Sequence, residues 1–250
     1  MPVTGRICNA GLSFSIFVHL RWPAFKPPVT EMGYSLQLIF SMVLAYLAGS
    51  VNFAILISRW ASGIDIRSTG NRNPGTANVG REVGRGWASL VFLGDMAKGL
   101  LVLILVRTLF FTGEGWTETL ALVLTGMSAI AGHCWPLYHG FRGGGGLATS
   151  IGIYMFFIPV EFFFTLVVGT LFVRTFFDGK KYPFGQLVPM VFVPLAPLVT
   201  MFTSFFSGIR LGDRIRVGGH SWHLVAGITL LSVTIIIINI RIVLGRFSKN

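Results

Sequence analysis

Four long stretches of this chain carry no Asp, Glu, Lys or Arg, and they constrain its fold more than any other feature. They cover residues 32–58, 119–141, 182–209 and 217–240. Each is longer than the roughly 20 residues that a helix needs to cross the hydrocarbon core of a membrane. Lipid offers backbone amides no hydrogen-bond partner, so such stretches must satisfy their own amides as helices. The sequence therefore predicts an all-α fold, a polytopic integral membrane helical bundle.

Charged residues make up only 12% of the chain, about half the share found in soluble domains. We expect six or seven transmembrane helices, over residues 34–58, 87–110, 119–138, 147–173, 185–206 and 223–244. The fourth of these regions holds Pro159 and Glu161 in its middle, so it is either one kinked helix or two shorter ones. We expect residues 1–31 to be a disordered N-terminal extension and residues 32–250 to be a single transmembrane domain.

The net charge of +11 fits the excess of Lys and Arg in cytoplasmic loops of membrane proteins. The 59–86 loop has five arginines against two acids, whereas the 112–118 loop has two glutamates and no basic residue. We therefore expect the first loop to face the cytoplasm and the second to face outside. The sequence shows no basic surface interleaved with aromatic residues, so we expect no nucleic-acid partner. It also lacks zinc-binding and dinucleotide-binding motifs, so we expect no metal and no cofactor.

A polar stretch between the first two predicted helices is rich in hydrogen-bond donors. It runs from Arg67 to Arg81 and includes Asn71, Gly75 and Asn78. Arginine binds phosphate through two parallel hydrogen bonds, and a glycine-bearing turn can direct successive backbone amides at an anion. The stretch is therefore a candidate anion-binding site, and the alternative is an ordinary solvated loop.

Two further groups of residues could carry chemistry inside the bundle. Asp95 and Lys98 lie three residues apart in an apolar helix, where charges are expensive and usually functional; the alternative is a neutralised structural pair. His133 precedes the glycine run 143–146, which lets a ligand approach the backbone closely. A helix that begins near Leu147 would present its positive N-terminus to an anion. The alternatives are a flexible hinge for the glycines and a structural role for His133.

Taken in order, these motifs resemble those of the PlsY family, the membrane acyl-phosphate:glycerol-3-phosphate acyltransferases of bacteria. The matching segments are Gly49-Ser50-Val51-Asn52-Phe53, Ser68 to Arg81, Asp95-Met-Ala-Lys98-Gly99, and Gly132-His133 to Thr149. The resemblance covers residues 49–152. Arg142 and Gly145 stand where the family has two lysines, and Asn239-Ile240-Arg241 faintly echoes a C-terminal family element.

The resemblance implies a multi-pass enzyme of the bacterial plasma (inner) membrane, with active-site loops facing the cytoplasm. Its substrates would be glycerol 3-phosphate and a fatty acyl phosphate, surrounded by membrane lipids. Catalytic roles are implied for Lys98, His133 and Asp95, and substrate binding for Ser50, Arg67, Asn71, Gly75, Asn78, Arg81, Arg142, Gly143, Gly144 and Gly145. The alternative is a non-catalytic or repurposed relative that binds lipids or anions, or a transporter.

Overall fold

The computed structural model describes residues 31–111, 113, 115–176, 184–205, 209–211, 215–217 and 220–247. The predicted N-terminal extension lies outside these residues, apart from Glu31, which begins the first helix. The longer helices are α1 (Glu31–Ser50), α2 (Phe53–Ser62), α4 (Arg85–Leu109), α5 (Trp116–Cys134), α6 (Leu147–Phe157), α7 (Pro159–Phe176), α8 (Phe184–Ser204) and α9 (Trp222–Phe247). The short elements are α3 (Thr76–Glu82), the 3-10 helix η1 (Leu137–His139), and the strands β1 (Ile209–Leu211) and β2 (Ile215–Val217).

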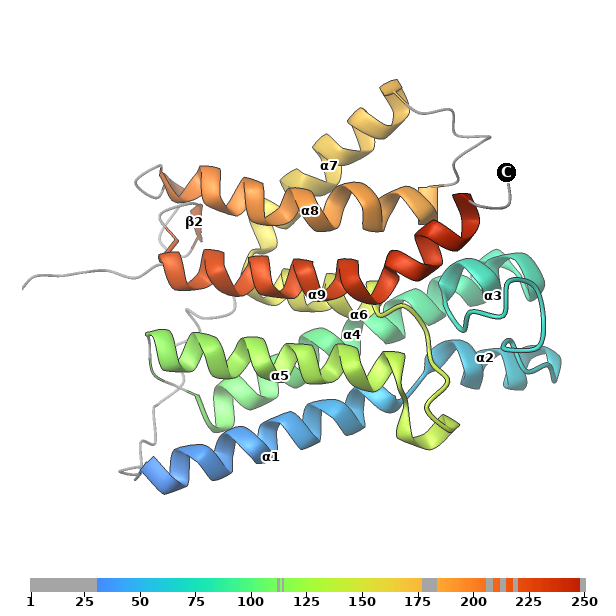
Figure 1. Ribbon diagram of the computed structural model, residues 1–250, viewed down its shortest axis with the longest axis horizontal. Helices are drawn as coiled ribbons and strands as arrows, with labels where there is room; N and C mark the ends of the chain where they lie inside the picture. The colour runs from blue at the N-terminus through green and yellow to red at the C-terminus, as the bar shows by residue number, and fades with distance from the viewer. Residues whose placement is uncertain are drawn as a thin grey trace, which may run out of the picture.

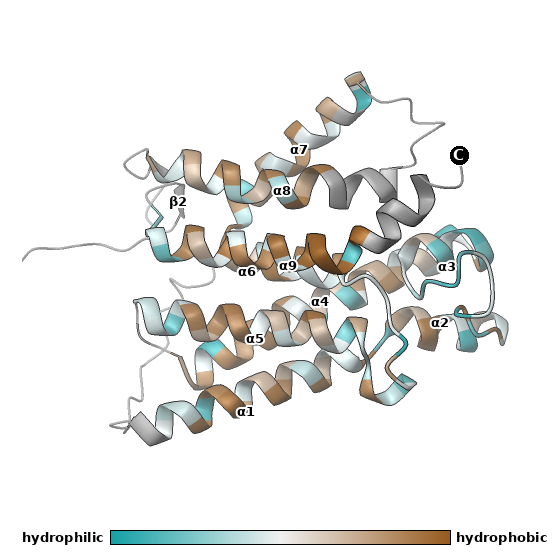
Figure 2. Ribbon diagram, in the orientation of Figure 1, coloured by the Kyte–Doolittle hydropathy of each residue, from teal (hydrophilic) through white to brown (hydrophobic). Residues whose placement is uncertain are grey.

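The predicted helical membrane bundle is confirmed. Among the residues that the structure describes, five helical segments are long and apolar enough to cross a membrane, and two shorter apolar helices accompany them. Figure 1 shows the long helices side by side, with α2, α3 and the 135–146 connection gathered at one end and the β1–β2 hairpin at the other. Hydrophobic residues dominate the helices, whereas hydrophilic residues concentrate around α2 and α3 (Figure 2). This end of the bundle therefore holds the polar stretch noted in the sequence.

The first predicted membrane helix is not continuous. It breaks after Ser50, and a second helix begins at Phe53. Asn52 caps this second helix, because its side-chain Oδ1 accepts a hydrogen bond from the backbone N–H of Ile55 at 3.1 Å. Asparagine is a preferred helix N-cap, since its side chain satisfies an amide that has no partner within the helix. The break leaves the Val51 carbonyl free to bind a side chain from a neighbouring helix.

The region 147–173 forms two helices, which decides between the two predicted alternatives. α6 ends at Phe157, and α7 begins at Pro159. Proline is favoured in the first turn of a helix, because it lacks the N–H that would be unpaired there. Pro159 therefore begins a new helix, and α6 starts at Leu147, as predicted.

Close helix packing positions the functional end of the bundle. The most extensive helix contacts join α1 to α5 and α4 to α6. At the first of these interfaces, a Cβ on Gly49 would collide with the Ala129 carbonyl, and one on Gly132 would collide with the Tyr46 carbonyl. Small residues allow membrane helices to approach closely in this way. The approach holds the end of α1 beside the end of α5, where the next contacts form.

Candidate functional site

Three buried polar side chains meet between α4 and α5. Asp95 and Lys98 come from α4 and His133 from α5, and their exposed fractions are 1%, 9% and 3%. Lys98 Nζ lies 2.8 Å from Asp95 Oδ1 and 3.0 Å from His133 Nδ1. It also donates a hydrogen bond of 2.6 Å to the Val51 carbonyl at the break between α1 and α2. The structure thus brings together the three residues for which the resemblance implies catalytic roles.

A charged Lys98 favours one tautomer of His133, since an ammonium group can donate to Nδ1 but cannot accept from it. Lys98 Nζ has hydrogen-bond partners in Val51 O and His133 Nδ1, and it forms an ion pair with Asp95 Oδ1. If His133 accepts at Nδ1, its proton is on Nε2. A Cβ on Gly144 would touch both this Nε2 and the Pro74 carbonyl. The Nε2–H therefore faces the place where the glycine run approaches the polar stretch.

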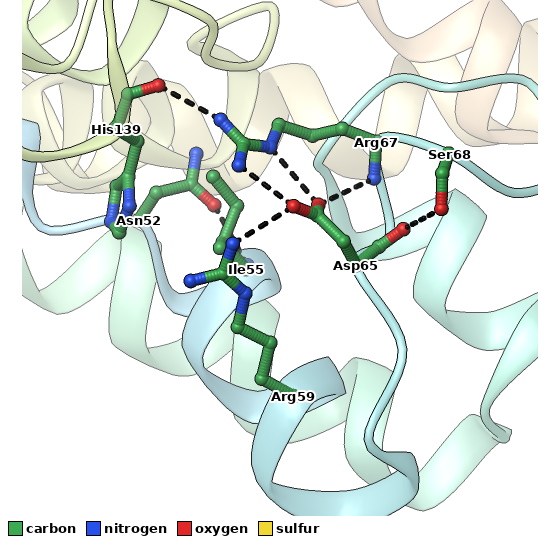
Figure 3. Close-up of polar contacts among 7 residues, drawn as sticks. All are labelled: Asn52, Ile55, Arg59, Asp65, Arg67, Ser68 and His139. Atoms are coloured by element: carbon green, nitrogen blue, oxygen red, sulfur yellow. Dashed lines mark hydrogen bonds and ion pairs between the residues drawn. The ribbon is translucent and has the colours of Figure 1, made fainter.

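Asp65 organises the polar stretch before α3. It receives hydrogen bonds from Arg67 Nε at 3.0 Å and Arg67 Nη2 at 2.7 Å, and from Arg59 Nη2 at 2.9 Å (Figure 3). The hydrogen bonds from the Arg67 side chain are the main cause that lowers the pKa of Asp65 below its ordinary value, and the same pairing raises the pKa of Arg67. Arg67 Nη1 also donates to the His139 carbonyl at 2.8 Å. One arginine therefore ties the polar stretch to η1.

Asn78 shapes the same stretch from within. Its side chain is only 1% exposed, and its Nδ2 donates to the Ile66 and Thr69 carbonyls, both at 3.1 Å. Its Oδ1 accepts the backbone N–H of Asn71 at 3.1 Å. These contacts use the amide group to hold the loop. Buried amide groups are normally hydrogen-bonded in this way. Asn78 therefore supports the site by holding the backbone of the loop.

The remaining predicted residues of α1 and α3 also lie in the loop framework. Ser50 Oγ donates to the Tyr46 carbonyl at 2.8 Å and accepts the backbone N–H of Leu137 at 3.2 Å. Gly75 is the N-cap residue of α3. Arg81 is exposed, and its Nη2 lies 3.4 Å from Asn78 Oδ1. These contacts connect α1, η1 and α3 around the polar stretch.

The glycine run folds back against the end of α5. The N–H groups of Gly143 and Gly144 donate to the carbonyls of Cys134 and His133, at 3.1 and 3.2 Å. The Gly145 carbonyl accepts a hydrogen bond of 2.9 Å from Asn239 Nδ2 on α9. Two of the four glycine amides are therefore used within the protein, and the run serves to bring α5, α6 and α9 close together.

A cleft of about 460 Å³ lies where the polar stretch meets the glycine run. Its lining includes the predicted residues Arg67, Arg142 and Gly143 together with Asp65, Ser68, Arg72 and Pro74. Three arginines against one acid give the cleft a positive charge, which suits an anionic ligand such as a phosphate. Asp65 and Arg72 were not among the site residues expected from the sequence. Their only signal was membership of the same arginine-rich stretch.

Comparisons with known proteins point in one direction. A family model described as glycerol-3-phosphate acyltransferase matches residues 39–247. The chain is 37% identical to a glycerol-3-phosphate acyltransferase from Shouchella clausii over 167 residues, which cover 66% of this chain and 77% of that protein. It is 34% identical to one from Neisseria meningitidis serogroup C over 163 residues, which cover 65% of this chain and 79% of that protein.

Solved structures agree with these sequence matches. The chain superposes on the glycerol 3-phosphate form of PlsY, an integral membrane glycerol 3-phosphate acyltransferase, with a TM-score of 0.61 and 25% identity. The lysophosphatidic acid form of PlsY gives a TM-score of 0.59 and the same identity. Each match covers 84% of this chain and 93% of the solved one.

Proposed function

We propose that this chain, which belongs to the glycerol-3-phosphate acyltransferase family, transfers a fatty acyl group from an acyl phosphate to the sn-1 hydroxyl of glycerol 3-phosphate. The products are 1-acylglycerol 3-phosphate and inorganic phosphate. One observation carries the proposal: an arginine-lined cleft lies beside a buried Asp95–Lys98–His133 triad in a membrane protein. The arginines can bind the phosphate groups of the substrates, and the surrounding lipid can accommodate the apolar acyl chain.

The reaction requires mainly positioning and charge stabilisation. The hydroxyl oxygen attacks the acyl carbonyl carbon, the carbon–oxygen bond to phosphate breaks, and the hydroxyl proton passes to the phosphate. An acyl phosphate is already activated, so a protein that fixes both substrates and stabilises the developing negative charge can supply most of the catalysis. No nucleophilic residue of the chain is needed.

We assign the residues of the site to two tasks. Arg142 binds phosphate, and Gly143 forms part of the wall. Arg67 holds the polar stretch against η1 through Asp65 and the His139 carbonyl. The Nε2–H of His133 donates toward the reacting groups, while Lys98, which is paired with Asp95, holds the imidazole in that tautomer. A hydrogen bond to one ring nitrogen of a histidine sets which of the two nitrogens carries the proton. The loop contacts of Ser50, Asn71, Gly75, Asn78 and Arg81, with those of Gly144 and Gly145, maintain the shape of the cleft.

The charge distribution supports an orientation in the membrane. The 59–86 loop, with its five arginines, contributes most of the cleft, and basic loops remain on the cytoplasmic side. We therefore place the site at the cytoplasmic face of the bacterial plasma membrane, where glycerol 3-phosphate is available from solution. The donor would enter from the surrounding lipid.

A reconstituted transfer assay tests the proposal. The protein is placed in phospholipid vesicles with palmitoyl phosphate and radiolabelled glycerol 3-phosphate, and labelled 1-palmitoylglycerol 3-phosphate is measured. We expect product from the unmodified protein and none from Lys98→Ala. Arg174→Ala is the control, because Arg174 is an exposed cation in the last turn of α7. Figure 1 shows α7 apart from α2 and α3.

The same assay includes two arms that could contradict the proposal. Palmitoyl-coenzyme A replaces palmitoyl phosphate in one arm, and product from the thioester alone would show that the donor class is wrong. In the other arm, the vesicles are filtered and the trapped label is identified. Unchanged glycerol 3-phosphate inside the vesicles, without product, would favour the transporter alternative.

A further inference from the structure

One arginine of the cleft has no role in the assignments above. We propose that Arg72 is a further substrate-binding residue, whose guanidinium binds a phosphate group in the cleft with Arg142. The inference rests on the proposed function, because both proposed substrates carry a phosphate group with the same chemistry. In this arrangement Arg72 and Arg142 contact the ligand.

The three arginines of the cleft differ in what they already bind. Arg67 uses Nε and Nη2 on Asp65 and Nη1 on the His139 carbonyl. Asp65, the one acid in the lining, is also bonded to Arg59. Within the described part of the chain, no acid pairs with the side chain of Arg72 or Arg142. Arg67 therefore serves chiefly to hold the cleft together, and the other two carry its available positive charge.

Two available guanidinium groups match the charge of a phosphate monoester, which approaches −2 at neutral pH. Each guanidinium can present two parallel N–H groups to a phosphate, a geometry that lysine does not offer. Arg72 precedes α3, and Arg142 precedes α6. A phosphate bound by both would therefore link the polar stretch to the glycine run across the mouth of the cleft.

The backbone of Arg72 shows that its loop position is imposed. Arg72 has φ 61°, a left-handed conformation that is uncommon for residues other than glycine. The conformation is held from both sides, since Arg72 N–H donates to the Thr69 carbonyl at 3.0 Å, and Asn73 N–H donates to Asn71 Oδ1 at 3.1 Å. Glycine would adopt this backbone without strain. Residues in strained backbone conformations are typical of functional sites, and the side chain of Arg72 lines the cleft.

Arg72→Gly separates a binding role from a structural one. The substitution removes the guanidinium and relieves the left-handed backbone, so we expect the thermal unfolding midpoint to stay the same or rise. We expect KM to rise about tenfold or more for the substrate whose phosphate Arg72 binds, as the loss of a charge-assisted hydrogen bond implies. Arg72→Lys keeps the charge without the two parallel donors, so its KM should lie between those of wild type and Arg72→Gly.

The assay measures KM separately for glycerol 3-phosphate and for palmitoyl phosphate, with the other substrate saturating. A rise for the first assigns Arg72 to the acceptor phosphate, and a rise for the second assigns it to the donor phosphate. If both KM values of Arg72→Gly stay within about twofold of wild type, Arg72 does not bind substrate. Arg174→Ala controls for the general loss of a cation. Absence of transfer by the wild type would instead contradict the proposed function, so the two failures are distinguishable.

Discussion

Replacement of Lys98 by methionine tests the buried triad most directly. Methionine keeps most of the length of the side chain but removes the ammonium group, which contacts Val51 O at 2.6 Å, Asp95 Oδ1 at 2.8 Å and His133 Nδ1 at 3.0 Å. Asp95 is 1% exposed, so its carboxylate would be left buried without its cation. Removal of one partner of a buried ion pair costs about 3–5 kcal/mol. We expect Lys98→Met to lower the free energy of unfolding by that amount.

The double variant Asp95→Asn/Lys98→Met distinguishes an unpaired charge from lost packing. With the carboxylate removed as well, we expect the double variant to recover about half or more of the lost stability, because neutral replacements of a buried pair are often tolerated. Asp95→Asn alone completes the thermodynamic cycle. Transfer activity should remain absent in both variants that lack Lys98, whatever their stability.

Denaturant unfolding in a mild detergent provides the free energies, and the vesicle assay provides the activities. A Lys98→Met protein within about 1 kcal/mol of wild type would refute the reasoning, since that is the range of an exposed pair. A double variant as unstable as Lys98→Met would also refute it, because the loss would then be one of packing.

Two further predictions concern the loop and the helix interface. Asp65 has a lowered pKa in the folded protein, so its pairs stabilise the fold fully above its unfolded pKa of about 4. This stabilisation declines progressively as pH falls from there toward the lower folded-state pKa. The unfolding midpoint of Asp65→Asn should therefore fall less than that of wild type between pH 6 and pH 3. Gly132→Val should lower the unfolding midpoint by several degrees or abolish folding, because its side chain would collide with the Tyr46 carbonyl. Gly86→Ala is the matched control, because a Cβ there meets no atom within 4 Å, and unfolding of Gly132→Val at the wild-type temperature would contradict the packing argument.

The helices could be predicted because the membrane leaves so few alternatives. Uncharged stretches such as 119–141 and 217–240 overlap α5 and α9 closely, since lipid requires each backbone amide to be bonded locally. The break at Val51 was not predicted. It depends on the Asn52 cap and on Lys98, which lies on another helix and reaches the exposed carbonyl. The hydrophobicity of a segment does not predict such a contact with another helix.

The types of residue in the site could be predicted from the sequence, but the role of each residue was harder to predict. The spacing of Asp95 and Lys98 placed them on one helix face, and the motifs added His133; the family resemblance is confirmed by the comparisons. The inward orientation of Asn78 and the ion pair between Arg67 and Asp65 depend on how the loops fold against each other. Arg72 is the clearest case, because nothing in its sequence position distinguishes an arginine that lines the cleft without an acid partner from one, such as Arg67, that binds a neighbouring acid.

The hydrogen bond from Asn239 to the Gly145 carbonyl has a consequence for the order in which the protein is made. Gly145 and Asn239 are far apart in the chain, and α9 is the last helix. During synthesis, the residues of the cleft, the triad and the glycine run are made before those of α9. Until that helix is in place, the Gly145 carbonyl lacks this donor, so the glycine run reaches its final hydrogen bonding only after α9 has been made. Completion of the site therefore follows the insertion of α9.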